Sequence, residues 1–501
     1  MEALDWLVIG VFFLALIGII VWVVRQKQND SADYFLGGRD ATWLAIGASI
    51  FASNIGSEHL IGLAGAGASS GMAMAHWEIQ GWMILILGWV FVPFYSRSMV
   101  YTMPEFLERR YNPQSRTILS VISLVSYVLT KVAVTVYAGG LVFQQVFGIK
   151  ELWGIDFFWI AAIGLVVLTA LYTIFGGMKS VLYTSVLQTP ILLLGSLIIL
   201  VLGFKELGGW DEMMRVCGAV TVNDYGDTMT NLIRSNDDAN FPWLGALIGS
   251  AIIGFWYWCT DQFIVQRVLS GKNEKEARRG TIFGAYLKLL PVFLFLIPGM
   301  IAFALHQKYI GAGGEGFLPM LANGTANADA AFPTLVAKLL PAGVKGLVVC
   351  GILAALMSSL ASLFNSSAML FTIDFYKRFR PETPEKKLVG IGQIATVVIV
   401  ILGILWIPIM RSVGDVLYTY LQDVQSVLAP GIAAAFLLGI CWKRTSAQGG
   451  MWGLIAGMII GLTRLGAKVY YSNAGEVADS TFKYLFYDMN WLFFCGWMFL
   501  F

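Results

Sequence analysis

The sequence predicts an all-α protein that crosses a membrane many times. Of its 501 residues, 57% are hydrophobic and only 13% are charged, whereas a typical soluble domain carries roughly 25% charged residues. The apolar residues gather into runs of about 16 to 32 residues, and an α-helix needs about 20 to span a bilayer. These two observations predict a polytopic helical bundle embedded in lipid.

Thirteen apolar runs predict thirteen spans. The first, at 6–24, is too long for the core of a signal peptide, so we expect a retained helix. The last run ends at Phe501 without a polar flank, so we expect the natural chain to continue beyond it. The twelve runs after the first lie near 42–65, 81–96, 117–147, 155–176, 182–203, 242–266, 280–304, 341–372, 388–410, 416–440, 448–465 and 483–501.

Basic residues predict the orientation of these spans. With the N-terminus outside, 20 of the 33 Lys and Arg residues lie in cytoplasmic segments, as the positive-inside rule expects. The segment 204–241, which carries seven acidic residues, then lies outside. We expect a multi-pass protein with its N-terminus outside, and the membrane that we expect is the plasma membrane.

Runs two to six and seven to eleven form two sets of five with matching length patterns. The third member of each set, at 117–147 and 341–372, is the longest. Because five is odd, the second set enters the membrane from the opposite side, which gives the inverted repeat of many secondary transporters. We expect an N-terminal extra helix in 1–30, a first repeat in 42–203, an extracellular loop in 204–241, a second repeat in 242–440, and extra helices in 448–501 with the final span absent or truncated.

The first run of each set carries polar residues at mid-span depth. These include Asn54, Glu58 and His59 in one run, and Thr260 and Asp261 in the other. Helix breaks survive in a membrane only against protein or a water-filled cavity, and corresponding broken helices indicate a transporter binding site. Close packing through small residues would account for the glycines there, but not for the ionisable groups.

A sugar pocket needs polar groups that donate and accept, together with an aromatic ring against the apolar face of the sugar. Ionisable residues inside spans are functional-site hypotheses, although a single one such as Lys131 could instead form a pair or reach toward water. The residues that supply this mixture are Asn54, His59, Glu78, Lys288 and Gln422, with Tyr257 as the ring.

Two neighbouring serines, Ser358 and Ser359, lie in the long run 341–372. A serine within a helix usually bonds to its own helix carbonyl. If this pair instead faces the break near 52–55, two hydroxyls and freed carbonyls form a neutral oxygen cage, and hard cations prefer oxygen ligands. Sodium would fit such a cage.

Several other functions lack sequence support. No Gly-x-x-x-x-Gly-Lys-Ser/Thr loop is present for ATP, and no basic stripe for nucleic acid. Five scattered cysteines and three histidines predict neither a zinc site nor a disulfide framework. No nucleophile, base and oxyanion set is visible. We expect no enzyme activity, no cofactor apart from sodium as the coupling ion, and no obligate protein partner.

Four stretches resemble the sodium/glucose cotransporter family of sodium:solute symporters, with motifs closest to those of animal glucose carriers. The likeness runs from Asp33 to Arg444 and implies a five-plus-five inverted repeat of the amino-acid transporter type, with alternating access. The stretches are Asp-Tyr-Phe-Leu-Gly-Gly-Arg at 33–39, Phe-Ala-Ser-Asn-Ile-Gly-Ser at 51–57, Trp-Tyr-Trp-Cys-Thr-Asp-Gln at 256–262 with Ile-Val-Gln-Arg at 264–267, and Leu-Met-Ser-Ser-Leu at 356–360.

By position, this resemblance implies a role for each candidate residue. The sugar ligands would be the five polar residues named above, with Tyr257 stacking on the sugar as the inner gate and Trp258 and Asp261 supporting that gate. The outer lid would consist of Leu63, Trp77 and Tyr418. Sodium would be held by the carbonyls of Ala52, Ile55 and Ala355 and by the hydroxyls of Ser358 and Ser359.

Four positions depart from the family pattern. Ser185 stands where an aspartate is usual, and Ala361 replaces a hydroxyl residue of members that couple two sodium ions, so we expect a single sodium. Gly254 and Gln425 stand where glucose-selective relatives carry threonines, which leaves the preferred sugar open. The expected substrate is a hexose such as glucose or galactose; the alternatives are a myo-inositol carrier and a sugar-gated sensor or channel.

Overall fold

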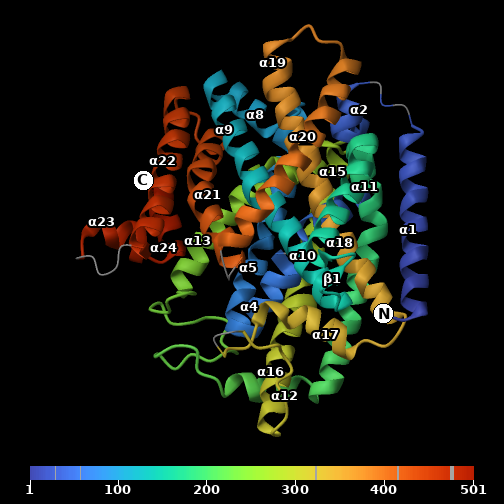
Figure 1. The fold of residues 1–501 in the computed structure, drawn as a ribbon. Coiled ribbons are helices and arrows are strands. Elements are labelled where there is room, and N and C mark those ends of the chain that lie inside the picture. Colours follow the sequence, from blue (N-terminus) through green and yellow to red (C-terminus); the bar gives the residue numbers. More distant parts are fainter. Residues whose placement is uncertain are drawn as a thin grey trace.

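A computed structural model of the chain is a bundle of long helices (Figure 1). It describes residues 1–26, 28, 30–56, 58–321, 324–413, 417–473 and 479–500, without the side chains of residues 129, 409–413, 417–423 and 472–473. Within these ranges, 10 helices are long and apolar enough to cross a membrane, and Trp43–Asn54 and Trp491–Leu500 are shorter apolar helices. The predicted polytopic all-α class is confirmed.

The first half of the chain contains the N-terminal extra helix, the first predicted repeat and the start of the loop that follows it. They are α1 (Ala3–Val24), α2 (Ser31–Leu36), α3 (Trp43–Asn54), η2 (Glu58–Leu63), α4 (Ala64–Ser70), α5 (Ala75–Ile79), η4 (Gln80–Trp82), α6 (Met83–Ile86), α7 (Val92–Ser98), α8 (Met103–Arg110), α9 (Pro113–Ser126), η6 (Tyr127–Val132), α10 (Ala133–Phe147), α11 (Phe157–Leu207) and α12 (Trp210–Gly218), with strands β1 (Glu151–Leu152) and β2 (Ile155–Asp156).

The second half continues with the second predicted repeat and the C-terminal helices. They are α13 (Trp243–Phe255), η7 (Trp256–Thr260), α14 (Gln262–Leu269), α15 (Glu274–Leu287), η8 (Val292–Leu296), α16 (Ile297–Gly311), α17 (Ala331–Leu339), α18 (Val344–Met369), η10 (Leu370–Tyr376), α19 (Lys377–Phe379), α20 (Glu385–Val413), α21 (Leu417–Cys441), α22 (Ala447–Asn473), α23 (Thr481–Lys483) and α24 (Trp491–Leu500).

Gly177 divides α11 into two spans. The 51 residues of α11 would form a rod of about 76 Å at 1.5 Å per residue, more than twice the thickness of the hydrocarbon core. Gly177 interrupts the helix with φ 53° and ψ −148°. A Cβ atom here would lie 2.4 Å from the carbonyl oxygen of Tyr34. The runs 155–176 and 182–203 are therefore separate spans, as the sequence predicts.

The extra helices flank the two sets of five. Figure 1 shows α1 at one side of the bundle and α22 to α24 at the opposite side. Between them, α18 packs on α11 and α3, and α3 packs on α15. The start of α1 and α12 lie at the same end, whereas α8 and α19 lie at the other (Figure 1). The positions of these elements at the two ends agree with the predicted order of the spans. Which end faces the cytoplasm stays a prediction.

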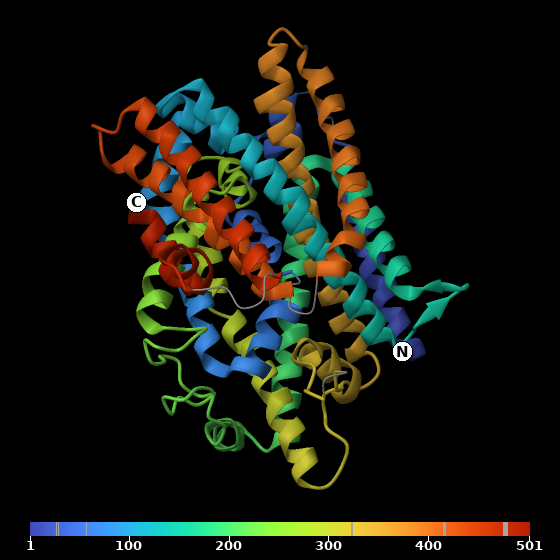
Figure 2. The same cartoon turned by 60° about the vertical axis from the view of Figure 1, so that its left-hand side comes forward.

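A short hairpin is the one piece of described sheet. Strands β1 and β2 pair antiparallel, with Glu151 opposite Asp156, and the turn residues Trp153 and Gly154 have φ 54° and 75°. Figure 2 shows the hairpin projecting from the bundle beside the N-terminus. The sequence analysis placed Ile155 and Asp156 in a helical run. That assignment is wrong because the two positive-φ residues reverse the chain just before α11 begins.

Two stretches of the family resemblance meet in the core. Tyr34, Phe35 and Leu36 of α2 are buried, and the Gln266 side chain of α14 donates a hydrogen bond to the Phe35 carbonyl at 2.7 Å. Gly37 ends α2 in the left-handed conformation at φ 61°, which glycine adopts without steric cost. These motif residues join the segment just before the first repeat to the second repeat.

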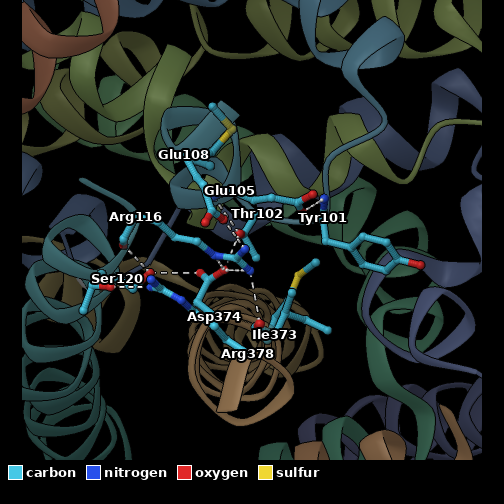
Figure 3. A network of polar contacts seen from close by, with 12 residues as sticks. Tyr101, Thr102, Glu105, Glu108, Arg116, Ser120, Ile373, Asp374 and Arg378 are labelled. Atoms are coloured by element: carbon cyan, nitrogen blue, oxygen red, sulfur yellow. Dashed lines mark hydrogen bonds and ion pairs between the residues drawn. The ribbon is translucent and has the colours of Figure 1, made fainter. Parts of the chain in front are cut away.

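A buried ion pair ties the two repeats together at the end of the bundle opposite α12. The carboxylate of Asp374, in η10, accepts hydrogen bonds from Arg116 Nε at 2.8 Å, Thr102 Oγ1 at 2.8 Å and Ser120 Oγ at 3.0 Å (Figure 3). Arg116 also lies 2.6 Å from Glu108. Several hydrogen bonds are what a buried charge requires to be stable, and here the three donors to Asp374 all come from the first repeat.

We expect Gly177→Ala to destabilise the protein, because its Cβ would collide with the Tyr34 backbone in a backbone conformation that strains a non-glycine residue. The loss should be about 1–3 kcal/mol, seen as a lower unfolding temperature of the protein in detergent. Gly164→Ala is the matched control, since a Cβ at Gly164 in the same helix meets open space. Equal stability of both variants would contradict this account.

Candidate functional site

Both predicted broken helices are broken. Helix α3 ends at Asn54, where Ile55 adopts φ −79° and ψ 98°, and helical structure resumes at η2. In the second repeat, η7 ends at Thr260, and Asp261, at φ −74° and ψ 128°, starts α14 as its N-cap. The two interruptions occur in corresponding runs of the two sets, which confirms this part of the sequence prediction.

A small polar cavity lies between the two broken helices. Its volume is about 20 Å³, room for about one water molecule. Three amides, two carboxylates, one ammonium and one imidazole border it, with two tryptophans and a tyrosine. The lining residues are Asn54, Glu58, His59, Trp77, Glu78, Gln80, Ile253, Tyr257, Trp258, Lys288 and Gln425.

Glu78, Lys288 and His59 form a buried charged cluster in this cavity. Lys288 Nζ lies 2.6 Å from Glu78 Oε2 and 2.7 Å from His59 Nε2. The same imidazole nitrogen lies 3.1 Å from Glu78 Oε1. With a neutral imidazole the carboxylate and the ammonium balance, so the cluster adds polar groups to the cavity without net charge.

Three residues that line the cavity each have a buried side-chain atom without a hydrogen-bond partner among the described residues. These atoms are Asn54 Oδ1, His59 Nδ1 and Gln80 Oε1, although the amide nitrogen of Asn54 donates to the Tyr257 hydroxyl at 3.0 Å. A buried polar atom without a partner costs about 1–3 kcal/mol. A ligand with several hydroxyl groups could satisfy all three, because each hydroxyl donates and accepts.

Tyr257 separates the cavity from a second buried ion pair. The Tyr257 ring meets the Trp258 ring at a centroid distance of 4.8 Å, nearly perpendicular. Lys131 Nζ lies 4.7 Å from the Tyr257 ring centroid and 2.7 Å from Asp261 Oδ2. The Tyr127 hydroxyl donates to the other oxygen of Asp261. Asp261 thus anchors the start of α14 beneath Tyr257.

Oxygen atoms from α3 and α18 converge at the first break. The Ser359 hydroxyl donates to the Ser53 carbonyl at 2.7 Å and lies 3.5 Å from the Ile55 carbonyl. Gly56 permits this approach, because a Cβ there would lie 2.7 Å from Ser359 Oγ. The predicted serine thus faces the break.

A chain of hydroxyls extends from this point. Ser358 Oγ lies 3.2 Å from Ser185 Oγ, and Ser185 Oγ lies 3.4 Å from Ser49 Oγ. Ser185 donates to its own helix carbonyl at Val181, at 2.6 Å. Since a hydroxyl has one proton, Ser185 offers only lone pairs to its neighbours. The cluster is therefore neutral where an aspartate would make it anionic.

The structure brings most of the predicted site residues together. Asn54, His59, Glu78, Tyr257 and Lys288 line one cavity, with Trp77 and Trp258, and Ala52 and Ala355 lie buried on the packed helices α3 and α18. Leu63 is buried in the core and is not among the described residues that line the cavity. Gln422 and Tyr418 lie on α21, but their side chains are outside the described residues.

The sequence analysis did not assign every lining residue to the site, although it had noted Glu58 and Gln425. The Ser53 carbonyl reaches Ser359, and Glu58, Gln80, Ile253 and Gln425 border the cavity. Glu58, Gln80 and Gln425 could be found from the sequence, because carboxylate and amide side chains are rare within membrane spans. The direction of a backbone carbonyl at a helix break cannot be predicted from the residue types.

The model of the sodium:solute symporter family matches residues 34–457. The chain belongs to the sodium:solute symporter family. It is also 38% identical to sodium/myo-inositol cotransporter 2 of Homo sapiens over 479 residues, covering 93% of this chain and 70% of that protein. Sodium/glucose cotransporter 2 of Rattus norvegicus is 38% identical over 512 residues, covering 98% of this symporter and 75% of the rat protein.

The fold of this symporter matches that of a solved transporter. A Na⁺-coupled sialic acid symporter superimposes with a TM-score of 0.78 at 21% identity, covering 100% of this chain and 96% of the other. The predicted inverted five-plus-five fold is confirmed. The chain is a multi-pass membrane transporter and not an enzyme.

We expect the buried pair Lys131–Asp261 to show strong coupling in a double-mutant cycle. Lys131→Met leaves a buried carboxylate unpaired, and Asp261→Asn leaves a buried ammonium unpaired; each should cost about 3–5 kcal/mol of stability. The double variant should lose much less than the sum, because no unpaired charge remains. Unfolding temperatures of the four proteins in detergent test this, and additive losses would refute the pairing.

Proposed function

We propose that this chain is a sodium-coupled symporter for a sugar or polyol, which moves a hexose such as glucose or galactose inward with one sodium ion by alternating access. One observation carries the proposal: α3 ends between a polar cavity lined by Asn54 and an oxygen cluster that includes the carbonyls of Ser53 and Ile55. A single helix end therefore contributes to a site for a polyol and to a site for a cation.

The substrate ligands in this proposal are the polar residues of the cavity. Asn54, His59, Glu78 and Lys288 offer donors and acceptors in close proximity, and Tyr257 offers a ring face. Gln422, on α21, is the remaining predicted ligand. Because the cavity has a volume of only about 20 Å³, a hexose must separate the Glu78, Lys288 and His59 side chains and replace their mutual contacts with its own hydroxyls.

The sodium ligands are the hydroxyls of Ser358 and Ser359 with carbonyls of the α3 break and of Ala355. Arg267 adds a further influence, since its Nε donates to Ser53 Oγ at 3.0 Å. A buried positive charge beside a neutral oxygen cluster weakens cation binding. Modest affinity suits a carrier that must release sodium into a low-sodium cytoplasm.

The two sites are coupled because adjacent residues of one chain segment serve both. Sodium bound at the Ile55 carbonyl would fix the end of α3, and with it the Asn54 side chain that faces the cavity. By thermodynamic linkage, the factor by which sodium raises sugar affinity must equal the factor by which sugar raises sodium affinity.

The proposed stoichiometry sets the accumulation ratio that the transporter can maintain for its substrate. A tenfold sodium gradient supplies about 1.4 kcal/mol per ion, and a membrane potential of about 60 mV adds roughly the same. The sum of about 2.8 kcal/mol supports about 100-fold accumulation of substrate. We place the carrier in the plasma membrane with its N-terminus outside, and without an obligate protein partner.

A myo-inositol carrier is the second candidate. Gly254 and Gln425 differ from the threonines expected in a glucose-selective relative, and Gln425 lines the cavity. The amides at Asn54, Gln80 and Gln425 increase the number of hydrogen-bonding groups available to a polyol.

Uptake by the purified chain in lipid vesicles tests the proposal. An inward sodium gradient should drive accumulation of at least one labelled compound among glucose, galactose and myo-inositol, and replacing sodium by potassium should abolish it. Charge and solute fluxes measured together should give one charge per solute, because Ser185 stands where an aspartate is usual and Ala361 where members that couple two sodium ions carry a hydroxyl residue. Two charges per solute would refute the single sodium, and current without accumulation would instead indicate a sensor or channel.

Removal of one proposed sodium ligand should separate the two sites. Ser359→Ala deletes the hydroxyl that meets the Ser53 and Ile55 carbonyls, so the sodium concentration for half-maximal uptake should rise about tenfold, equivalent to about 1.4 kcal/mol. Ser270→Ala is the control, because the buried Ser270 hydroxyl bonds to its own helix carbonyl at Gln266. An unchanged sodium dependence in Ser359→Ala would remove that serine from the site.

A further inference from the structure

An apolar groove lies between α1 and the first span of α11, away from the polar cavity. Its volume is about 470 Å³, and among the described residues that line it Arg25 is the one charged group. Apolar residues within 168–175 of α11 form one wall. On α1 the lining residues recur every three or four positions, which places them on one face of the helix. They are Phe13, Leu16, Ile17, Ile20, Val21 and Val24.

The groove has a closed apolar floor and an open rim. Leu16, Tyr172 and Met357 line it and are buried, and the Tyr172 hydroxyl donates to the Met357 carbonyl at 2.9 Å. The floor therefore offers a ligand apolar surface, with its one hydroxyl already bonded. On the rim, Ile17 and Leu171 are 52% and 51% exposed. In a bilayer this rim faces hydrocarbon, so the ligand that fills the groove must itself be apolar along its length.

Contacts at both ends of α1 hold the groove open. Near the start of the helix, Asp5 accepts hydrogen bonds from the backbone nitrogens of Gly343 and Gly346 at 2.7 and 2.8 Å. Near its end, the Trp22 ring meets the Tyr183 ring at a centroid distance of 5.0 Å. The side chains between these two attachments do not fill the space, and atoms that line an unfilled space lose dispersion contacts. A hydrocarbon chain in the groove would restore those contacts.

The length and the charge of the groove match one leaflet of a bilayer. From Phe13 to Arg25, α1 rises about 18 Å at 1.5 Å per residue, and half of the hydrocarbon core is about 15 Å thick. Arg25 follows the last residue of α1 and lines the end of the groove. A second cation is close to it, because Lys179 Nζ lies 3.2 Å from Oε1 of the next residue, Gln26. An acyl chain in the groove thus places its headgroup beside two positive charges.

We propose that this groove binds one acyl chain of an anionic phospholipid, with the headgroup phosphate beside Arg25 and Lys179. A guanidinium can donate two parallel hydrogen bonds to a phosphate. A net negative headgroup suits this end better than a zwitterionic one, whose own ammonium would compete for the phosphate. In the proposed orientation this end of α1 faces the cytoplasm, and the cytoplasmic leaflet is the one that carries anionic lipids. The inference goes beyond the proposed function and does not depend on it.

The test uses the purified chain in detergent with a phosphatidylglycerol that carries a photoreactive diazirine in its acyl chain. After illumination, mass spectrometry should find the label concentrated on peptides that contain residues 13–24 and 168–175. Unlabelled phosphatidylglycerol should compete for this labelling about fivefold or more better than phosphatidylcholine with the same acyl chains, because each basic residue near an anionic lipid favours binding by about that factor.

Variants separate the apolar groove from the charged end. Ile17→Trp and Leu171→Trp fill the groove from opposite walls, so each should lower the labelling several-fold. Leu14→Trp is the matched control, because Leu14 is on the same helix, is 71% exposed and does not line the groove. Arg25→Gln should lower the preference for phosphatidylglycerol about fivefold. Its control is Arg97→Gln, which removes an exposed arginine outside the groove.

Each remaining outcome counts against the lipid site. Equal or better competition by phosphatidylcholine or cholesterol would assign the groove to a neutral lipid and overturn the proposal. Label spread evenly over the exposed helices, labelling unchanged in both groove variants, or an unchanged lipid preference in Arg25→Gln would do the same. Unfolding temperatures in detergent show which variants are folded, and Arg25→Gln, at an exposed position, stays informative if a tryptophan variant is not. None of these measurements uses sodium-driven uptake, so failure of the lipid site and failure of the proposed function are separate results.

Discussion

The break in α3 determines the geometry of the whole binding region. Hydrocarbon cannot hydrogen-bond the carbonyl groups that an interrupted helix releases, so those groups require partners from elsewhere in the protein. Ser359 of α18 provides one, with its hydroxyl at the Ser53 and Ile55 carbonyls. The same arrangement leaves oxygen atoms concentrated at one point and turns Asn54 toward the polar cavity.

Three buried ion pairs are the second feature that determines the structure. Glu78–Lys288, Lys131–Asp261 and Arg116–Asp374 each join a residue of the first repeat to a residue of the second. Taking such charges out of water is expensive, and only good geometry with additional hydrogen bonds compensates. The pairs therefore define how the two repeats meet, at the cavity, below Tyr257, and near one end of the bundle.

Much of this arrangement could be predicted from the sequence. Apolar run length is a local property, so the spans were recognisable, and Asn54 and Asp261 marked the breaks because polar groups are rare at that depth. The partner of Asp374 could not be predicted, since Arg116 lies 258 residues away. Nor could the contact between Gly254 and Gln80, which depends on how closely two helices approach. The hairpin before α11 depended on two positive-φ residues within an otherwise apolar stretch.

The close contacts among Glu78, Lys288 and His59 leave little space in the cavity, and this limits which solutes it can accept. If the proposed function holds, a sugar or polyol enters this space by replacing the contacts among these side chains with bonds to its own hydroxyls. A small apolar molecule has no hydroxyl with which to replace those contacts. On this account the cavity selects solutes by hydrogen-bonding capacity more than by size.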